Sequence, residues 1–127
     1  MVIEISAIVA CLLLASLGVF QLFLALGYPL GKFAWGGAHT VLPKRLRIGS
    51  AISILLYLIF AVFILSESGL VDIVTNRQVT SIVIWVLTAY FALGVFMNSI
   101  SRSKPERAVM TPIALILALC CACIAIN

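Results

Sequence analysis

The residues best suited to chemistry are four cysteines, of which Cys120 and Cys123 form a C-x-x-C pair. Such a pair in a helix is typical of thiol–disulfide chemistry. Four-helix quinone reductases of the vitamin K type use one, together with loop cysteines that relay electrons. Here Cys11 and Cys121 also lie in apolar runs, and no loop contains a cysteine. The pattern therefore favours small apolar packing residues over a redox site.

Ionisable side chains are missing from the apolar runs of the chain. Proton-coupled transporters and membrane-embedded acid–base enzymes carry such a group at membrane depth. Small multidrug-resistance transporters share this chain length but need a carboxylate well inside their first helix, and Glu4 lies too close to its end. We therefore expect a non-enzymatic protein with no catalytic residue and no cofactor. The single histidine, His39, lies far from the cysteines, so we expect no metal site either.

Gln21 is the most polar side chain of the first apolar run. An amide that enters hydrocarbon without a hydrogen-bond partner is strongly destabilising, so Gln21 must pair inside the protein. Two interpretations remain open: a hydrogen bond between helices, which we favour, and contact with a ligand. The polar residues expected inside the membrane are Gln21, Tyr57, Thr88 and Asn98, and with Tyr90 they could also line a path through an oligomeric channel.

The composition decides which elements must position these residues. Hydrophobic residues make up 65% of the 127 positions and charged residues 9%, and the mean hydropathy is +1.30. Soluble domains contain about 25% charged residues, and a membrane span needs about 20 apolar ones. The sequence predicts four transmembrane helices at about 5–26, 48–65, 81–100 and 104–125, with Ser103 and Glu106 as a capping box. Because the connections are short, we expect one all-α domain, an up-down-up-down antiparallel bundle.

The basic residues indicate how the bundle is oriented. Seven of the eight Lys and Arg side chains fall in the first and third loops, and the middle loop contains only Arg77. The positive-inside rule then places these two loops in the cytoplasm and both termini outside. This asymmetry opposes the dual topology of bacterial fluoride channels, which are similar in size. It also accounts for the net charge of +4 without a nucleic-acid partner.

The first loop, residues 27–47, mixes glycine, aromatic and basic residues. Aromatic rings such as Trp35 suit the headgroup region of a bilayer, and the pair Gly36–Gly37 permits close approach of another backbone. Two interpretations remain open: an interfacial anchor that sets orientation, which we favour, and a pocket for an anion or a lipid headgroup. The residues of this hypothetical site are Trp35, His39, Lys44, Arg45, Arg47, Arg102 and Arg107.

Several short motifs also suggest a family. They are Ala34-Trp35-Gly36-Gly37, Leu42-Pro43, Leu46-Arg47-Ile48-Gly49-Ser50, Ser101-Arg102-Ser103, Glu106-Arg107 and Pro112. In these motifs the chain resembles a group of small, uncharacterised bacterial four-helix membrane proteins. The resemblance covers most of the chain and implies the bacterial cytoplasmic (inner) membrane, without implying an activity.

Two functions fit these features. The first is a protein that binds membrane lipids, including anionic headgroups, or a membrane-protein partner through its loops and helix faces. The alternative is a channel or small transport subunit formed by homo-oligomerisation.

Overall fold

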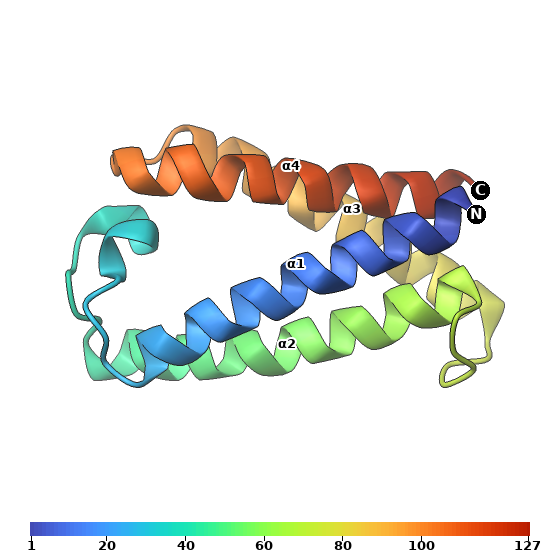
Figure 1. Ribbon diagram of the computed structural model, residues 1–127, viewed down its shortest axis with the longest axis horizontal. Coiled ribbons are helices and arrows are strands. Elements are labelled where there is room, and N and C mark those ends of the chain that lie inside the picture. The colour runs from blue at the N-terminus through green and yellow to red at the C-terminus, as the bar shows by residue number, and fades with distance from the viewer.

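The computed structural model describes all 127 residues and consists of four long helices without a strand (Figure 1). The helices are α1 (Val2–Ala25), α2 (Lys44–Ser68), α3 (Arg77–Ser99) and α4 (Lys104–Ile126). Each is long and apolar enough to cross a membrane. The structure thus confirms the predicted antiparallel four-helix bundle, and the chain is a multi-pass membrane protein. Both termini lie at one end of the bundle, opposite the first and third loops.

Three helices begin about one turn earlier than predicted, and α1 starts at Val2 rather than near residue 5. α2 starts at Lys44 rather than near residue 48, and α3 starts at Arg77 rather than near 81. The prediction counted apolar residues only, whereas the backbone ladder continues into the polar residues that flank a span. At α3 the side chain of Asn76 accepts hydrogen bonds from the N–H groups of Gln78 and Val79, which fixes this helix start.

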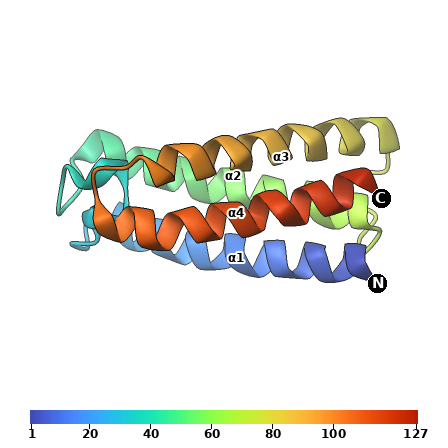
Figure 2. The same cartoon turned by 90° about the horizontal axis from the view of Figure 1, so that it is seen from above.

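The closest packing lies in the half of the bundle that contains the termini. α1 packs mainly on α2 and α3 mainly on α4, and α1 also contacts α4. Figure 1 shows α1 and α4 close together near the termini and diverging toward the basic loops, and Figure 2 shows the two helices as neighbours. Small residues allow the close approach near the termini. The apolar core consists of Ala7, Ala10, Leu14, Ile64, Ile84, Leu87, Phe91, Leu117, Ala118, Cys121 and Ile124.

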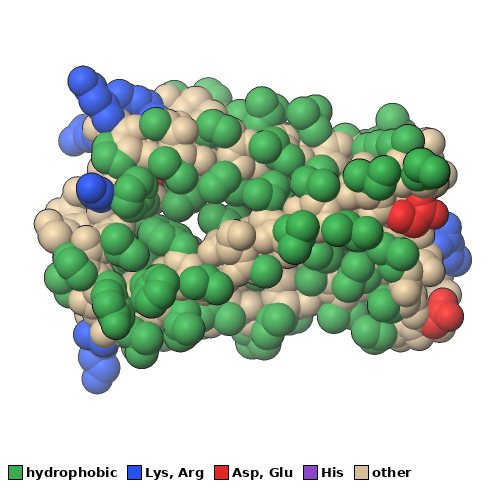
Figure 3. Space-filling view, viewed as in Figure 1, with side chains coloured by type: hydrophobic (Ala, Val, Ile, Leu, Met, Phe, Trp, Pro, Cys, Tyr) green, Lys and Arg blue, Asp and Glu red, His purple; other side chains and the backbone are tan.

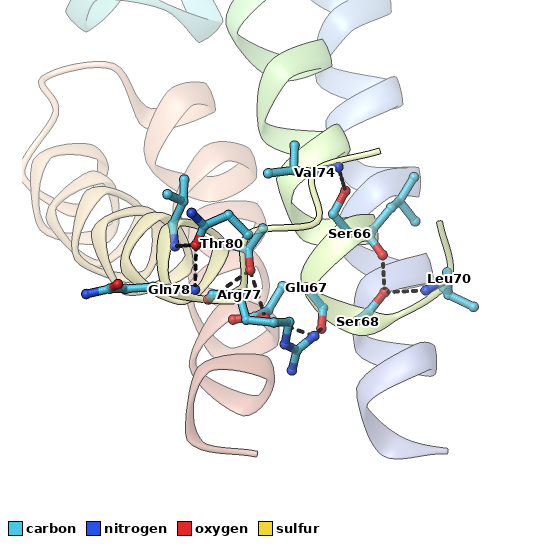
Figure 4. Close-up of polar contacts among 11 residues, drawn as sticks. Ser66, Glu67, Ser68, Leu70, Val74, Arg77, Gln78 and Thr80 are labelled. Atoms are coloured by element: carbon cyan, nitrogen blue, oxygen red, sulfur yellow. Dashed lines mark hydrogen bonds and ion pairs between the residues drawn. The ribbon is translucent and has the colours of Figure 1, made fainter. Parts of the chain in front are cut away.

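The turn between α2 and α3 is held by polar contacts (Figure 4). The carboxylate of Glu67 accepts a hydrogen bond from Thr80 Oγ1 at 3.1 Å and lies 3.3 Å from Arg77 Nη1. Ser66 Oγ accepts a hydrogen bond from the Val74 N–H at 3.2 Å. Gly69 ends α2 in the left-handed conformation, with φ of 84°. These contacts join the end of α2 to the start of α3 at the face that carries the termini.

Candidate ligand cavity and its covering loop

The first loop folds back on itself at the basic end of the bundle. It contains two short 3-10 turns, η1 (Gly31–Phe33) and η2 (Trp35–Gly37). The Gly31 N–H donates a hydrogen bond to the Thr40 carbonyl at 2.9 Å. A Cβ atom at position 31 would lie 1.9 Å from the His39 carbonyl oxygen, so only glycine fits. Residues 31–40 therefore form a compact loop whose two ends are joined by a backbone hydrogen bond.

The loop is fastened to the start of α4. The Gly36 N–H donates to Glu106 Oε2 at 3.0 Å, and the Ser103 hydroxyl donates to the Lys32 carbonyl. A Cβ atom at Gly37 would lie 2.7 Å from Ser103 Cβ, so the two backbones approach closely. Trp35, Gly36 and Gly37 all have positive φ, at 53°, 69° and 74°. Three consecutive residues with positive φ are unusual when one of them is as bulky as Trp35. This backbone conformation turns the loop toward α4.

Glu106 joins α4 to the first loop, although the sequence indicated only a helix-capping role for it. Ser103 Oγ accepts a hydrogen bond from the Glu106 N–H, as predicted for a helix cap. The carboxylate does not return to the Ser103 N–H, and the prediction of a reciprocal capping box is wrong in this respect. Glu106 Oε2 instead accepts hydrogen bonds from Gly36 and from the Ser101 hydroxyl, and Ser101 Oγ accepts from the Ser103 N–H at 3.1 Å. The side chain is 8% exposed.

Below this loop the four helices enclose a cavity of about 380 Å³. Residues from α1, α2, α3, α4 and the loop line it, and most of them are apolar. Trp35 belongs to the lining, and its ring lies 3.7 Å from the position that a Cβ at Gly49 would take. The polar lining consists of Gln21, Ser50, Ser53, Tyr57, Tyr90, Asn98 and Glu106. Glu106 is therefore the only charged residue in the lining.

The predicted intramembrane polar residues divide into two groups. Gln21 Nε2 donates to the Tyr57 hydroxyl at 3.4 Å, which joins α1 to α2 inside the cavity lining. Asn98 lines the cavity as well, at the end of α3. Thr88 lies outside the lining, and its hydroxyl donates to the Ile84 carbonyl of its own helix at 2.8 Å. Three of the four predicted polar residues therefore line one cavity within a single bundle.

Ser50 is the most deeply buried polar residue of the lining. Its residue exposure is 1%, and its hydroxyl makes no hydrogen bond within the protein. Ser53, one turn further along α2, instead donates to the Gly49 carbonyl at 3.0 Å. A buried hydroxyl without a partner costs about 1–3 kcal/mol. Ser50 therefore contributes a hydroxyl group without a partner to the wall of the cavity.

A second hollow lies beside the cavity, between α1 and α4. This hollow has a volume of about 240 Å³ and shares Leu17, Phe20, Phe33, Met110 and Ile113 with the cavity. The space-filling view shows the surface hollowed here, between α4 above and α1 below, with basic side chains at the same end (Figure 3). In a bilayer the space between two outer helices faces lipid, so the cavity opens sideways into the membrane.

The basic residues predicted to bind an anion lie outside the cavity lining. Arg47 Nε donates to the Ala25 carbonyl at 2.9 Å, and Arg107 Nη1 donates to the Ser101 carbonyl at 2.7 Å. Arg47 therefore bonds to the carbonyl end of α1, and Arg107 bonds to the loop between α3 and α4. The other members of the hypothetical site are Lys44, Arg45 and Arg102, which are exposed, and His39, which is half-buried. An anion at this surface stays a prediction.

Fold and site together define a multi-pass membrane protein with a laterally open cavity under a folded loop. No protein-family model, curated protein or solved structure matches the chain. The resemblance to small bacterial four-helix membrane proteins therefore stays a prediction.

Proposed function

We propose that the protein binds an amphiphilic membrane lipid in the cavity between its four helices and acts as a non-enzymatic lipid-binding protein. The observation that carries this proposal is the combination of an apolar lining with an unpaired, buried Ser50 hydroxyl in a cavity that opens between α1 and α4. The apolar lining accepts the chain of the lipid, and Ser50 lies at the end where a polar head would reach.

The size and the composition of the cavity support this occupant. Pockets that hold small ligands measure about 300–1,000 Å³ and combine a mostly apolar wall with a few placed polar groups. The cavity lies within this range at about 380 Å³. Burial of each CH₂ group of a lipid chain contributes about 0.8 kcal/mol when water is the reference, but far less when the chain comes from the bilayer. Selectivity must therefore come from the polar head.

The proposed orientation places the cavity in the cytoplasmic leaflet of a bacterial inner membrane, with both termini outside. The charge asymmetry between the loops supports it, since seven basic residues lie at the cavity end of the bundle. Lys44, Arg45 and Arg102 then face anionic phospholipid heads, at about 1 kcal/mol each. These contacts would anchor the protein around the lateral opening.

Lipid retention in a cavity-filling variant tests the proposal. Gly94 lines the cavity, and a Cβ there would lie 3.8 Å from Ala114 Cβ. Gly94→Phe should therefore fill the space with a ring. Ala92→Phe is the matched control, because Ala92 is exposed on the same helix and lies outside the lining.

Native mass spectrometry of both variants, purified from membranes in mild detergent, measures bound lipid per protein. The proposal predicts lipid on the unaltered protein and on Ala92→Phe, and loss of at least nine-tenths of it on Gly94→Phe. Equal retention by the two variants would show that lipid binds elsewhere.

A further inference from the structure

The polar groups at the loop end of the cavity come from three helices. Ser50 lies in the second turn of α2, Asn98 near the end of α3 and Glu106 in the first turn of α4. The loop crosses this end of the cavity, since the Trp35 ring lies over Gly49 of α2 while the neighbouring Gly36 N–H bonds to Glu106 of α4. These three side chains therefore lie at one end of the cavity, beneath a common cover.

Glu106 acts as a hydrogen-bond acceptor in this group. The Gly36 N–H and the Ser101 hydroxyl both donate to its Oε2 atom. Its Oε1 atom makes no hydrogen bond within the protein. A ligand that donates a hydrogen bond would complete the carboxylate, whereas a ligand with acceptors alone would leave Oε1 without a donor.

Charge excludes two kinds of head group. An anionic head would enter a cavity whose only charged lining residue is a carboxylate, and like charges at short range in a weakly polarisable environment repel strongly. A quaternary ammonium head has no hydrogen atom to donate to Glu106 Oε1, and the seven Lys and Arg residues at this end of the bundle repel it. Ser50 and Asn98 are neutral and can each donate and accept.

From this arrangement we infer that the ligand carries an uncharged head with hydroxyl groups, as in an acylglycerol. This inference rests on the proposed function and specifies its ligand class. One hydroxyl donates to Glu106 Oε1, and a second exchanges hydrogen bonds with Ser50 Oγ, which has no partner within the protein. The acyl chain leaves along Leu17 and Ile113 through the opening between α1 and α4.

A competition experiment with chains of equal length tests the head group. Monoacylglycerol, alkyl phosphate and alkyltrimethylammonium are offered at equal mole fractions in mixed micelles at pH 7, and native mass spectrometry counts each on the protein. Monoacylglycerol should exceed each charged competitor by at least tenfold. Ser50→Ala should lower its occupancy several-fold, and the control Ser99→Ala should not, because Ser99 is exposed, lies outside the cavity lining and bonds within its own helix. Glu106→Gln should raise the relative occupancy of the alkyl phosphate.

The outcomes separate the two proposals. Preferential retention of the alkyl phosphate or of the ammonium compound would overturn the assignment of the head group while leaving lipid binding in the cavity intact. So would equal retention of all three compounds, provided that Gly94→Phe abolishes it. If no compound were retained, or if Gly94→Phe retained all three like the unaltered protein, the proposed function itself would fail.

Discussion

The close approach of the first loop to α4 can be tested by adding one methyl group at either of two adjacent glycines. Gly36 and Gly37 both have positive φ, so alanine at either position carries a backbone cost of about 1–2 kcal/mol. Only at Gly37 would the added methyl group meet another residue, since its Cβ would be 2.7 Å from Ser103 Cβ, whereas a Cβ at Gly36 meets nothing within 4 Å. Crowding of this kind costs about 1–3 kcal/mol. Displacement of the Ser103 hydroxyl from the Lys32 carbonyl adds about 1 kcal/mol.

Gly37→Ala should therefore lower the stability of the loop packed on α4 by about 2–4 kcal/mol more than Gly36→Ala does. The loss cannot exceed the free energy that holds the loop on α4, because the loop then detaches. Detachment would leave the helices folded, so two assays are needed. Unfolding in mixed micelles reports the free energy of the whole bundle, and hydrogen exchange of residues 31–40 reports the loop. We expect faster exchange in Gly37→Ala than in Gly36→Ala. Equal exchange and equal stability of the two variants would refute the described packing of the loop.

Two further substitutions test interactions at opposite ends of the bundle. Arg47→Gln should lower the free energy of unfolding by about 1.5–3 kcal/mol, because Arg47 makes a charged hydrogen bond to the end of α1. Arg45→Gln, at an exposed neighbour, should change the free energy of unfolding by under about 0.5 kcal/mol. Denaturation in mixed micelles measures both variants, and equal losses would contradict the role assigned to Arg47. Glu67→Gln should lower the free energy of unfolding by about 1 kcal/mol, because Glu67 contacts Thr80 and Arg77 in the α2–α3 turn. Asp72→Asn, at an exposed position of the same turn, should leave the stability unchanged. Thermal unfolding distinguishes the two variants, and an unchanged stability of Glu67→Gln would show that this carboxylate does not hold the turn.

The helices and their order could be predicted because a chain that crosses lipid can adopt few backbone structures. Long apolar runs must be helical to satisfy their backbone, and short connections make neighbouring helices antiparallel. The helix starts at Lys44 and Arg77 were missed because hydrogen bonding along a helix does not stop at the edge of the hydrocarbon. The clustering of basic residues at one end followed from the topology alone.

The site was harder to predict because it depends on contacts between distant segments. The pattern Ser103-x-x-Glu106 indicated a local cap, but the donor that Glu106 accepts from is Gly36, which is 70 residues away in the chain. The available signal was the pair Gly36–Gly37, which indicated close backbone approach without naming the partner. Arg47 likewise fitted a headgroup ligand, and only the folded loop brings it to the end of α1. The environment of Gln21, by contrast, followed from the cost of an unpaired amide in hydrocarbon.

The most direct test of lipid binding in the cavity is photo-crosslinking with a lipid that carries a diazirine on its acyl chain. The labelled lipid is reconstituted with the protein in bilayers, and the modified residues are mapped by mass spectrometry. Binding through the opening between α1 and α4 predicts adducts concentrated on the residues shared by the cavity and the hollow, which are Leu17, Phe20, Phe33, Met110 and Ile113. Labelling spread evenly over outward-facing residues such as Leu12, Leu55 and Leu119 would contradict it.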